Sequence, residues 1–267
     1  MSSSILPPEG EHLATGWEPD LPADDSLVRQ AVLAHASWAV AAARRADRPW
    51  YDDATWSGGI LGDRGPITNW IIPKQPVPTQ DVIAAVDREL PRDVPYLFVS
   101  PWPTPDLTPY GLALAGHPPL MMHFPNTPTA PLTTTLEIRQ VTTPEELADA
   151  EQVLVNGYPL PELQPYHQGD LYSPTFLAGD TAAWVAYDGP TPVATSVAHH
   201  AHGMTVVENV AALPQARGRG AGAAITWAAT THHLTHPATL IASDAGQPIY
   251  QRLDYVRLER WTVWVRP

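Results

Sequence analysis

A glycine-rich turn between a predicted strand and a predicted helix constrains the fold of this chain more than any other segment. The stretch LPQARGRGAGAAITWAA (213–229) continues an apolar run, TVVENVAAL, and leads into an alanine-rich helix predicted from about Gly222 to His233. Gly218, Gly220 and Gly222 lack a Cβ atom, so a ligand can approach the main chain closely. The unpaired N–H groups and the dipole at a helix N-terminus attract phosphate. The segment therefore predicts an anion-binding strand–turn–helix.

Several ligand classes compete for this loop. A nucleoside-triphosphate loop ends in Gly-Lys-Ser/Thr, whereas Gly222 is followed by two alanines, so that class is excluded. A dinucleotide fingerprint needs the spacing G-x-G-x-x-G early in the chain and an acid about twenty residues further on, and both are missing here. Arg217 and Arg219 can add charge-assisted hydrogen bonds, which favours a diphosphate. The alternative that the glycines only reverse the chain stays open.

The chain after a proline- and threonine-rich linker, HFPNTPTAPLTTT (123–135), has a regular pattern of elements. Thr143 is the predicted N-cap of a helix that has Pro144 in its first turn. The other elements expected from period and turn residues are strands at 136–141, 181–188, 191–200, 205–213, 238–243 and 256–265, a helix at 222–233 and a short helix at 246–254. This order predicts an α/β fold with a mixed, mostly antiparallel sheet flanked by helices in 136–267.

The first half, 1–122, is an α/β segment with a less regular pattern. It contains a predicted amphipathic helix at 24–46, strands at 67–72 and 95–100, and a helix at 79–90 between them. Its last segment, LTPYGLALAGH, resembles QPIYQRLDYV near the end of the chain, which suggests a degenerate copy of one fold. Tryptophans gather in this half, and we expect them in an aromatic core in preference to one wall of an acceptor cleft: Trp17, Trp50, Trp56, Trp70 and Trp102.

Composition excludes several functional classes. The 267 residues suit one large domain or two modest ones, and a 44% hydrophobic content is typical of a globular protein. A formal net charge of −13 argues against nucleic acid and is compatible with a cationic substrate. The absence of cysteine excludes disulfides and thiolate chemistry. No apolar run is long enough for a membrane span and the first residues are unlike a signal peptide, so we expect a cytoplasmic protein.

Two motifs resemble the GNAT superfamily of N-acetyltransferases. The segment VENVAALPQARGRGAGAAITWAA is similar to its acyl-CoA-binding segment, in which a strand ends at a proline and R-G-x-G-x-G/A opens a helix; Pro214 and Arg217 fall in register with the glycines. The family signature Y-x-x-x-G-F/Y is matched by Tyr250 and Tyr255, with Asp254 in place of the glycine. Asp accepts the positive φ expected there at moderate cost. The resemblance covers about 136–267.

The resemblance implies the GNAT fold and transfer of an acetyl group from acetyl-CoA to an amine within a ternary complex. The diphosphate would bind the loop formed by Arg217, Gly218, Arg219, Gly220, Ala221 and Gly222. The strand VVENVAAL would separate from TLIAS, and main-chain groups of Ala211, Ala212 and Leu213 would bind the cofactor arm. Ser243, at the end of TLIAS, would contact the same arm.

The resemblance also places Tyr250 at the position of the general acid, and a phenol with a pKa near 10 is a suitable proton donor to a thiolate. Packing of the short helix is the alternative role. Glu208 is the one carboxylate in an otherwise apolar strand, which makes it a candidate base. Strand alternation predicts that it shares a face with Val206, Val210 and Ala212. Relatives commonly carry a glutamate about two residues earlier, so a salt-bridged glutamate or a base acting through water stays open.

Histidines offer a further set of candidates. His199 or His200 could act as a base on the substrate side. His200 and His202 share a strand face, and His232 and His236 lie one helical turn apart, but no third ligand is nearby, so we expect no metal. A serine hydrolase is excluded because no G-x-S-x-G elbow occurs.

The acceptor is not identified by the sequence beyond a small-molecule or peptide amine. Residues 160–176 and parts of the first half are expected to shape its pocket, and the acyl length stays open. Two alternatives remain, a non-catalytic acyl-CoA-binding sensor or scaffold and an enzyme that acetylates one dedicated protein partner. We expect a monomer or homodimer with no nucleic-acid or membrane partner.

Overall fold

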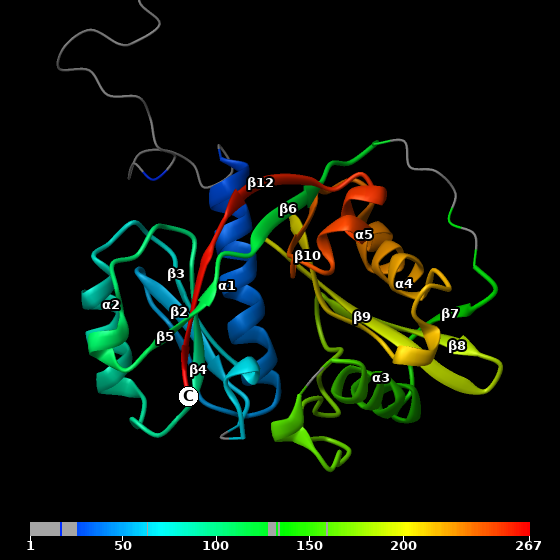
Figure 1. The fold of residues 1–267 in the computed structure, drawn as a ribbon, viewed down its shortest axis with the longest axis horizontal. Helices are drawn as coiled ribbons and strands as arrows, with labels where there is room; N and C mark the ends of the chain where they lie inside the picture. Colours follow the sequence, from blue (N-terminus) through cyan, green and yellow to red (C-terminus); the bar gives the residue numbers. More distant parts are fainter. Residues whose placement is uncertain (1–16, 18–25, 63, 128–131, 133, 159) are drawn as a thin grey trace, which may run out of the picture.

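The computed structural model describes residue 17 and residues 26–62, 64–127, 132, 134–158 and 160–267. These residues form two mixed, mostly antiparallel sheets flanked by helices, as expected (Figure 1). The first sheet has the order β1 (Trp50–Asp52), β2 (Trp56–Ile60), β3 (Asn69–Pro73), β4 (Tyr96–Ser100), β13 (Thr262–Arg266), β5 (Ala113–Gly116). The second has the order β12 (Val256–Arg260), β6 (Pro119–His123), β11 (Ala238–Ile241), β10 (Met204–Ala212), β9 (Thr191–Ala201), β8 (Thr181–Asp188), β7 (Glu137–Gln140).

The two sheets repeat one topology. In the first, antiparallel β2 and β3 are followed by helix α2 (Thr79–Glu89) and by β4, which is parallel to β3. In the second, antiparallel β9 and β10 are followed by helix α4 (Ala221–Thr230) and by β11, which is parallel to β10. The two segments that resemble each other in sequence connect equivalent strands, since one joins β4 to β5 and the other joins β11 to β12. The repeated topology supports the internal repeat suggested by the sequence.

Each half gives its last strand to the other sheet. Strand β6 lies between β11 and β12, and β13 lies between β4 and β5. The prediction of one strand over 256–265 is therefore wrong, because the chain changes sheets at Trp261. This residue is fully buried, and its main-chain N–H donates to the carbonyl of Pro118 at 3.0 Å. Pro118 is the point at which the first half also changes sheets. The two consecutive polar residues Glu259 and Arg260 interrupt the apolar alternation just before the break, and the prediction of one strand passed over this signal.

The other predicted elements are found close to their expected bounds. Strand β8 covers the predicted residues, and helix α3 (Pro144–Gly157) begins with a capping box in which Thr143 and Glu146 bond each other's main-chain N–H groups. Helix α4 ends at Thr230 and is followed by a 3₁₀ turn, Thr231–His233. Parts of two predictions, residues 24 and 25 of the first helix and residues 128–131 and 133 of the linker, lie outside the described residues. No helix in the described ranges has the length and apolarity that a bilayer crossing requires.

Helix α1 (Leu27–Arg45) lies between the two sheets (Figure 1). It contacts β2 and β3 of the first sheet and β9 and β10 of the second. The predicted amphipathic helix is in fact buried on several faces, because it packs against both sheets. Alanines allow this close packing, and Ala39 lies so near β2 that a Cβ on Gly59 would stand 2.0 Å from its carbonyl oxygen. Helix α1 therefore sets the spacing between the two halves.

The short helix α5 (Gln247–Arg252) ends in a Schellman motif. The N–H of Tyr255 donates to the carbonyl of Tyr250 at 3.0 Å, and the N–H of Asp254 donates to Gln251 at 3.2 Å. Asp254 has a φ of 61°, so the positive φ expected at this position is confirmed. The hydroxyl of Tyr255 lies 2.7 Å from that of Thr230 on α4 and anchors the end of the motif.

Asp254→Gly is expected to stabilise the protein by about 0.5–1 kcal/mol, because glycine adopts a left-handed conformation without the steric cost of a Cβ. Urea unfolding at neutral pH measures the change as a higher midpoint. Asp254→Ala is the matched control and is expected to lower the midpoint. A destabilised Asp254→Gly protein would show that the aspartate side chain makes a favourable interaction of its own.

Candidate functional site

The glycine loop leaves main-chain donors free at the start of α4. After β10 the chain makes a 3₁₀ turn, Pro214–Ala216, and passes through Gly218 and Gly220 with φ of 74° and 79°. Among the described residues, no main-chain carbonyl accepts from the N–H groups of Gly218, Gly220, Ala221 or Gly222. These donors and the helix dipole are available to an anion, and the binding of a phosphate here stays a prediction.

The two arginine side chains of the loop are bonded to other parts of the protein. Arg217 donates through Nη2 to the carbonyl of Gly157, at the end of α3, at 3.2 Å, and Arg219 pairs with Asp188 on the surface. A Cβ on Gly222 would meet only Ile249, at 3.6 Å, so glycine is not required there by packing. Positive φ instead makes Gly218 and Gly220 the two constrained positions.

Strands β10 and β11 pair only at their first residues. The parallel register is Thr205↔Ala238 and Val206↔Thr239, and the strands diverge beyond it. The expected separation of the two strands is thus present. Leu213 donates its N–H to Val193 on β9 at 2.9 Å, so this donor is used within the sheet.

A bulge in β10 changes which side chains share a face. The antiparallel register with β9 shifts between Glu208 and Ala211, and Asn209 has a φ of 53°. As a result Val206 and Ala211 pack on the α1 side, whereas Val210 and Ala212 pack against the cluster that contains α4. The prediction that Glu208 shares a face with Val210 and Ala212 is therefore wrong, because the extra residue reverses the alternation.

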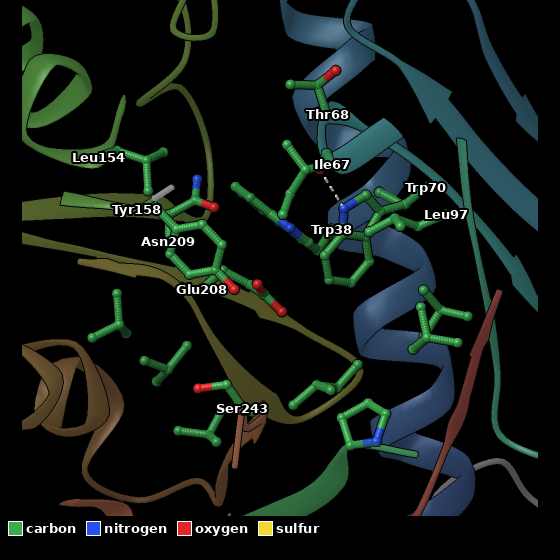
Figure 2. Close-up of a pocket in the computed structure, with 18 of the residues that line it drawn as sticks. Trp38, Ile67, Thr68, Trp70, Leu97, Leu154, Tyr158, Glu208, Asn209 and Ser243 are labelled. Atoms are coloured by element: carbon green, nitrogen blue, oxygen red, sulfur yellow. Dashed lines mark hydrogen bonds between the residues drawn. The ribbon is translucent and has the colours of Figure 1, made fainter. Parts of the chain in front are cut away.

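A cavity of about 430 Å³ lies between the diverging strands and the first half of the chain (Figure 2). Val210, Ser243 and Tyr250 line its second-sheet side. Trp38 of α1 lines the opposite side with first-half residues beyond it, namely Gly59, Ile67, Trp70, Leu97 and Val99. The predicted acceptor segment 160–176 adds further residues, namely Leu160, Leu171, Tyr172 and Phe176.

Glu208 projects into this cavity between Ser243 and the tryptophans (Figure 2). Its side chain is 12% exposed, and its Oε1 lies 3.3 Å from Nδ1 of His35 on α1. His35 is fully buried, with its ring edge-on to Trp261, and neither ring nitrogen has a hydrogen bond of good geometry to a described residue. The sequence analysis missed His35, whose only signal was a lone histidine in an apolar helix.

Two tyrosines share this environment. Tyr250 lines the cavity, as predicted, and Tyr158 at the end of α3 points toward Glu208 (Figure 2). Burial raises the pKa of Tyr250, and the negative charge of Glu208 and the nearby Tyr158 raise it further. Burial and Glu208 likewise raise the pKa of Tyr158. Both phenols therefore keep their protons at neutral pH. Tyr158, like His35, was missed, because its sequence neighbours carry no motif.

The histidines considered as substrate-side bases do not reach the cavity. His199 is buried between β9 and α1, where its ring nitrogens lie 3.0 Å from Ser37 Oγ and 2.9 Å from Thr181 Oγ1. Burial, reinforced by the positive charge of Arg45, lowers the pKa of His199 to about 4. His200 lies on the other face, with its ring against His233 and His236. Within the described ranges, no three histidine or carboxylate side chains are placed to hold a metal ion.

The tryptophans divide between the two roles considered for them. Trp56 is 2% exposed and lies in the core, which was the expected role, whereas Trp70 forms part of the cavity wall. Trp17 and Trp102 pack edge to face with ring centroids 5.4 Å apart. Trp50 is exposed beneath Arg44. The expectation of a common aromatic core is therefore correct for Trp56 but not for Trp50 or Trp70.

Comparison with known proteins identifies the fold. No protein-family model matches the sequence, and no curated protein is significantly similar to it. A solved GCN5-related N-acetyltransferase from Kribbella flavida is similar in structure, with a TM-score of 0.63 and 20% identity over 91% of this chain and 96% of its own. A protein assigned to the GNAT family from Novosphingobium aromaticivorans has a TM-score of 0.57 and 14% identity, covering 88% of this chain and 97% of its own.

A conserved protein of unknown function from Staphylococcus epidermidis is also similar, with a TM-score of 0.56 and 14% identity over 80% of this chain and 92% of its own. Three solved structures thus match both halves of the chain, and two of them are described as GNAT proteins. The chain has the two-sheet fold of GNAT N-acetyltransferases.

Proposed function

We propose that the protein is an acyl-CoA-dependent N-acetyltransferase that transfers the acetyl group of acetyl-CoA directly to an amine of a small molecule or peptide. The observation that carries this proposal is one cavity that begins where β10 and β11 diverge and holds a carboxylate, Glu208, shielded from water. The free main-chain donors of the glycine loop stand at the end of the same strand.

The residues present fit the co-substrate. The N–H groups of Gly218, Gly220, Ala221 and Gly222 would hold its diphosphate, with Arg217 and Arg219 at the edge. The opening between β10 and β11 would take the arm, beside main-chain groups of Ala211 and Ala212 and the side chain of Ser243. Acetyl-CoA supplies a thioester: transfer forms a carbon–nitrogen bond, breaks the carbon–sulfur bond, removes a proton from nitrogen and places one on sulfur.

The side chains in the cavity can carry both protons. Glu208 accepts the proton from the amine nitrogen, since its carboxylate is shielded from water and faces the cavity. Tyr250 keeps a proton on Oη at neutral pH and donates it to the departing thiolate. His35, behind Glu208, acts as a positioning residue that limits the rotamers of the carboxylate.

Gly218→Ala is expected to weaken acetyl-CoA binding about tenfold or more, measured by isothermal titration calorimetry, because the added methyl group would take up open space beside the loop that the diphosphate would occupy. Gly203→Ala is a matched control: Gly203 has a φ of 70°, and neither glycine has another atom within 4 Å of an added Cβ. Both variants lose similar stability, so only the effect on binding separates them.

Release of free thiol with acetyl-CoA and a panel of amines tests turnover. Wild-type protein that binds no acetyl-CoA would refute the proposal, as would equal binding by the two glycine variants. Tight binding without turnover on any amine would favour the non-catalytic module instead.

A further inference from the structure

The cavity has an apolar side that the co-substrate would not fill. The arm of an acyl-CoA would enter from the β10–β11 opening, whereas the wall on the far side of Glu208 belongs to α1 and the first sheet. That wall consists of Trp38, Ile67, Trp70, Leu97 and Val99, continued by Phe176. Figure 2 shows Trp38, Trp70 and Leu97 facing the carboxylate of Glu208 across the cavity.

Two of the polar groups around this side of the cavity are already used. Nε1 of Trp70 donates to the carbonyl of Ile67 at 2.8 Å, so the indole presents only its apolar ring to the cavity. Nδ2 of Asn209 donates to the hydroxyl of Tyr172 at 2.8 Å. An occupant of this side meets carbon atoms almost everywhere, and several of its own hydroxyl or amino groups would lose water without compensation.

Leaving histidine aside, the charged side chains that line the cavity have one sign. Among the described residues that line it, none is a lysine or arginine, and two, Glu208 and Asp244, carry a carboxylate. The side chain of Asp244 is 90% exposed and lies 4.0 Å from Arg260, whereas that of Glu208 is 12% exposed. A cation brought to Glu208 gains a strong partner. An anion meets that carboxylate, and the nearby groups that can become positively charged are imidazoles, namely His35, 3.3 Å from Oε1 of Glu208, and His117 in the lining.

We propose that the acceptor is a monoamine with a bulky aromatic or aliphatic body and no carboxylate of its own. This inference rests on the proposed function. The amino group is held at Glu208, and the body lies between Trp38 and Trp70, where flat rings pack favourably. Polyamines are excluded because a second ammonium would lie against the apolar wall. Amino acids are excluded because their carboxylate would lie beside Glu208.

Three probes of stated chemistry separate these classes. Phenethylamine, phenylalanine and putrescine are titrated into the protein by calorimetry with and without saturating coenzyme A. Phenethylamine is expected to bind at least about tenfold more tightly than either of the others, because phenylalanine shares its ring but adds a carboxylate and putrescine lacks the apolar body. Equal or preferred binding of phenylalanine or putrescine would overturn the inference.

A charge change in the wall provides a second test. Ile67 lies on the short 3₁₀ helix Pro66–Thr68, half-buried beside the cavity, where a longer side chain can be accommodated. Ile67→Arg is expected to weaken phenethylamine binding about tenfold or more and to reduce the discrimination against phenylalanine, whereas Ile67→Leu is expected to keep wild-type preference. An unchanged preference in Ile67→Arg would contradict the inference.

Acetyl-CoA binding by the same variants identifies which proposal fails. Both Ile67 variants are expected to bind acetyl-CoA with wild-type affinity, since Ile67 lies on the far side of the cavity from Ser243. Acetyl-CoA binding with transfer only to polyamines or amino acids would refute the acceptor class alone. Phenethylamine binding without any acetyl-CoA binding would refute the proposed function and leave the pocket assignment standing.

Discussion

Glu208→Gln is expected to lower kcat for acetyl transfer by about 10²–10⁴-fold, because the amide keeps the shape of the side chain and cannot accept the proton of the amine. The carboxylate faces the cavity in a largely enclosed position, and the described cavity lining offers no other carboxylate that is comparably shielded. The measurement is free-thiol release at saturating acetyl-CoA over a range of amine concentrations. The affinity for acetyl-CoA is expected to stay at the wild-type value.

The control for this prediction is Glu259→Gln. Glu259 is also a partly buried glutamate, but its Oε1 accepts a hydrogen bond from Trp261 Nε1 at 2.7 Å and it does not line the cavity. Its replacement should leave kcat unchanged. Near-normal turnover in Glu208→Gln would show that another group or a water chain removes the proton. An increase in KM with unchanged kcat would show that Glu208 only binds the amine.

The same strand shows where sequence reasoning about the site reaches its limit. Glu208 stood out because a carboxylate interrupts an apolar run, and the structure places it in a cavity. Alternation then failed one residue later, since the bulge at Asn209 depends on how β10 pairs with β9. A bulge adds one residue to one strand, and its position is set by a partner that local periodicity does not contain.

Most elements of the fold were predictable for a local reason. The cap at Thr143, the bounds of β8 and the left-handed Asp254 depend on residues within a few positions of each other. The exchange of β6 and β13 depends on pairing across more than a hundred residues, and both strands keep an apolar pattern in either sheet. The two-sheet arrangement therefore emerged only from the structure, although the similar segments before β5 and β12 pointed to a repeat.

The residues of the candidate site likewise fall into those that local sequence predicts and those that only tertiary packing brings in. The glycine loop and Tyr250 follow one another along the chain in a recognisable pattern. His35, Trp38 and Trp70 reach the site only because α1 packs between the two sheets and the cavity extends past it to β3 of the first sheet. A histidine or tryptophan within an apolar segment is typical of a core residue. The sequence alone therefore did not show whether such a residue lines a cavity or packs in the core.

Gly59→Ala is expected to destabilise the protein by about 3 kcal/mol, because it forces apart the helix and the sheet that form the cavity. The added Cβ would stand 2.0 Å from the carbonyl oxygen of Ala39 and 2.9 Å from the Cβ of Ala43. Both belong to α1, and a main-chain oxygen in a helix cannot move aside without moving the helix. Gly59 is on β2, a buried strand, so the strand cannot yield toward solvent either.

Gly62→Ala is the control, since a Cβ there meets no atom within 4 Å and its stability should change by about 0.5 kcal/mol or less. Urea unfolding of both variants gives the comparison, and acetyl transfer by folded Gly59→Ala protein adds a functional measurement. A displaced α1 moves His35 away from Glu208 and Trp38 away from the cavity wall, so activity should fall even at temperatures where the variant is folded. A Gly59→Ala protein of wild-type stability and activity would show that α1 can shift freely, and the cavity would then not depend on the contact between α1 and β2.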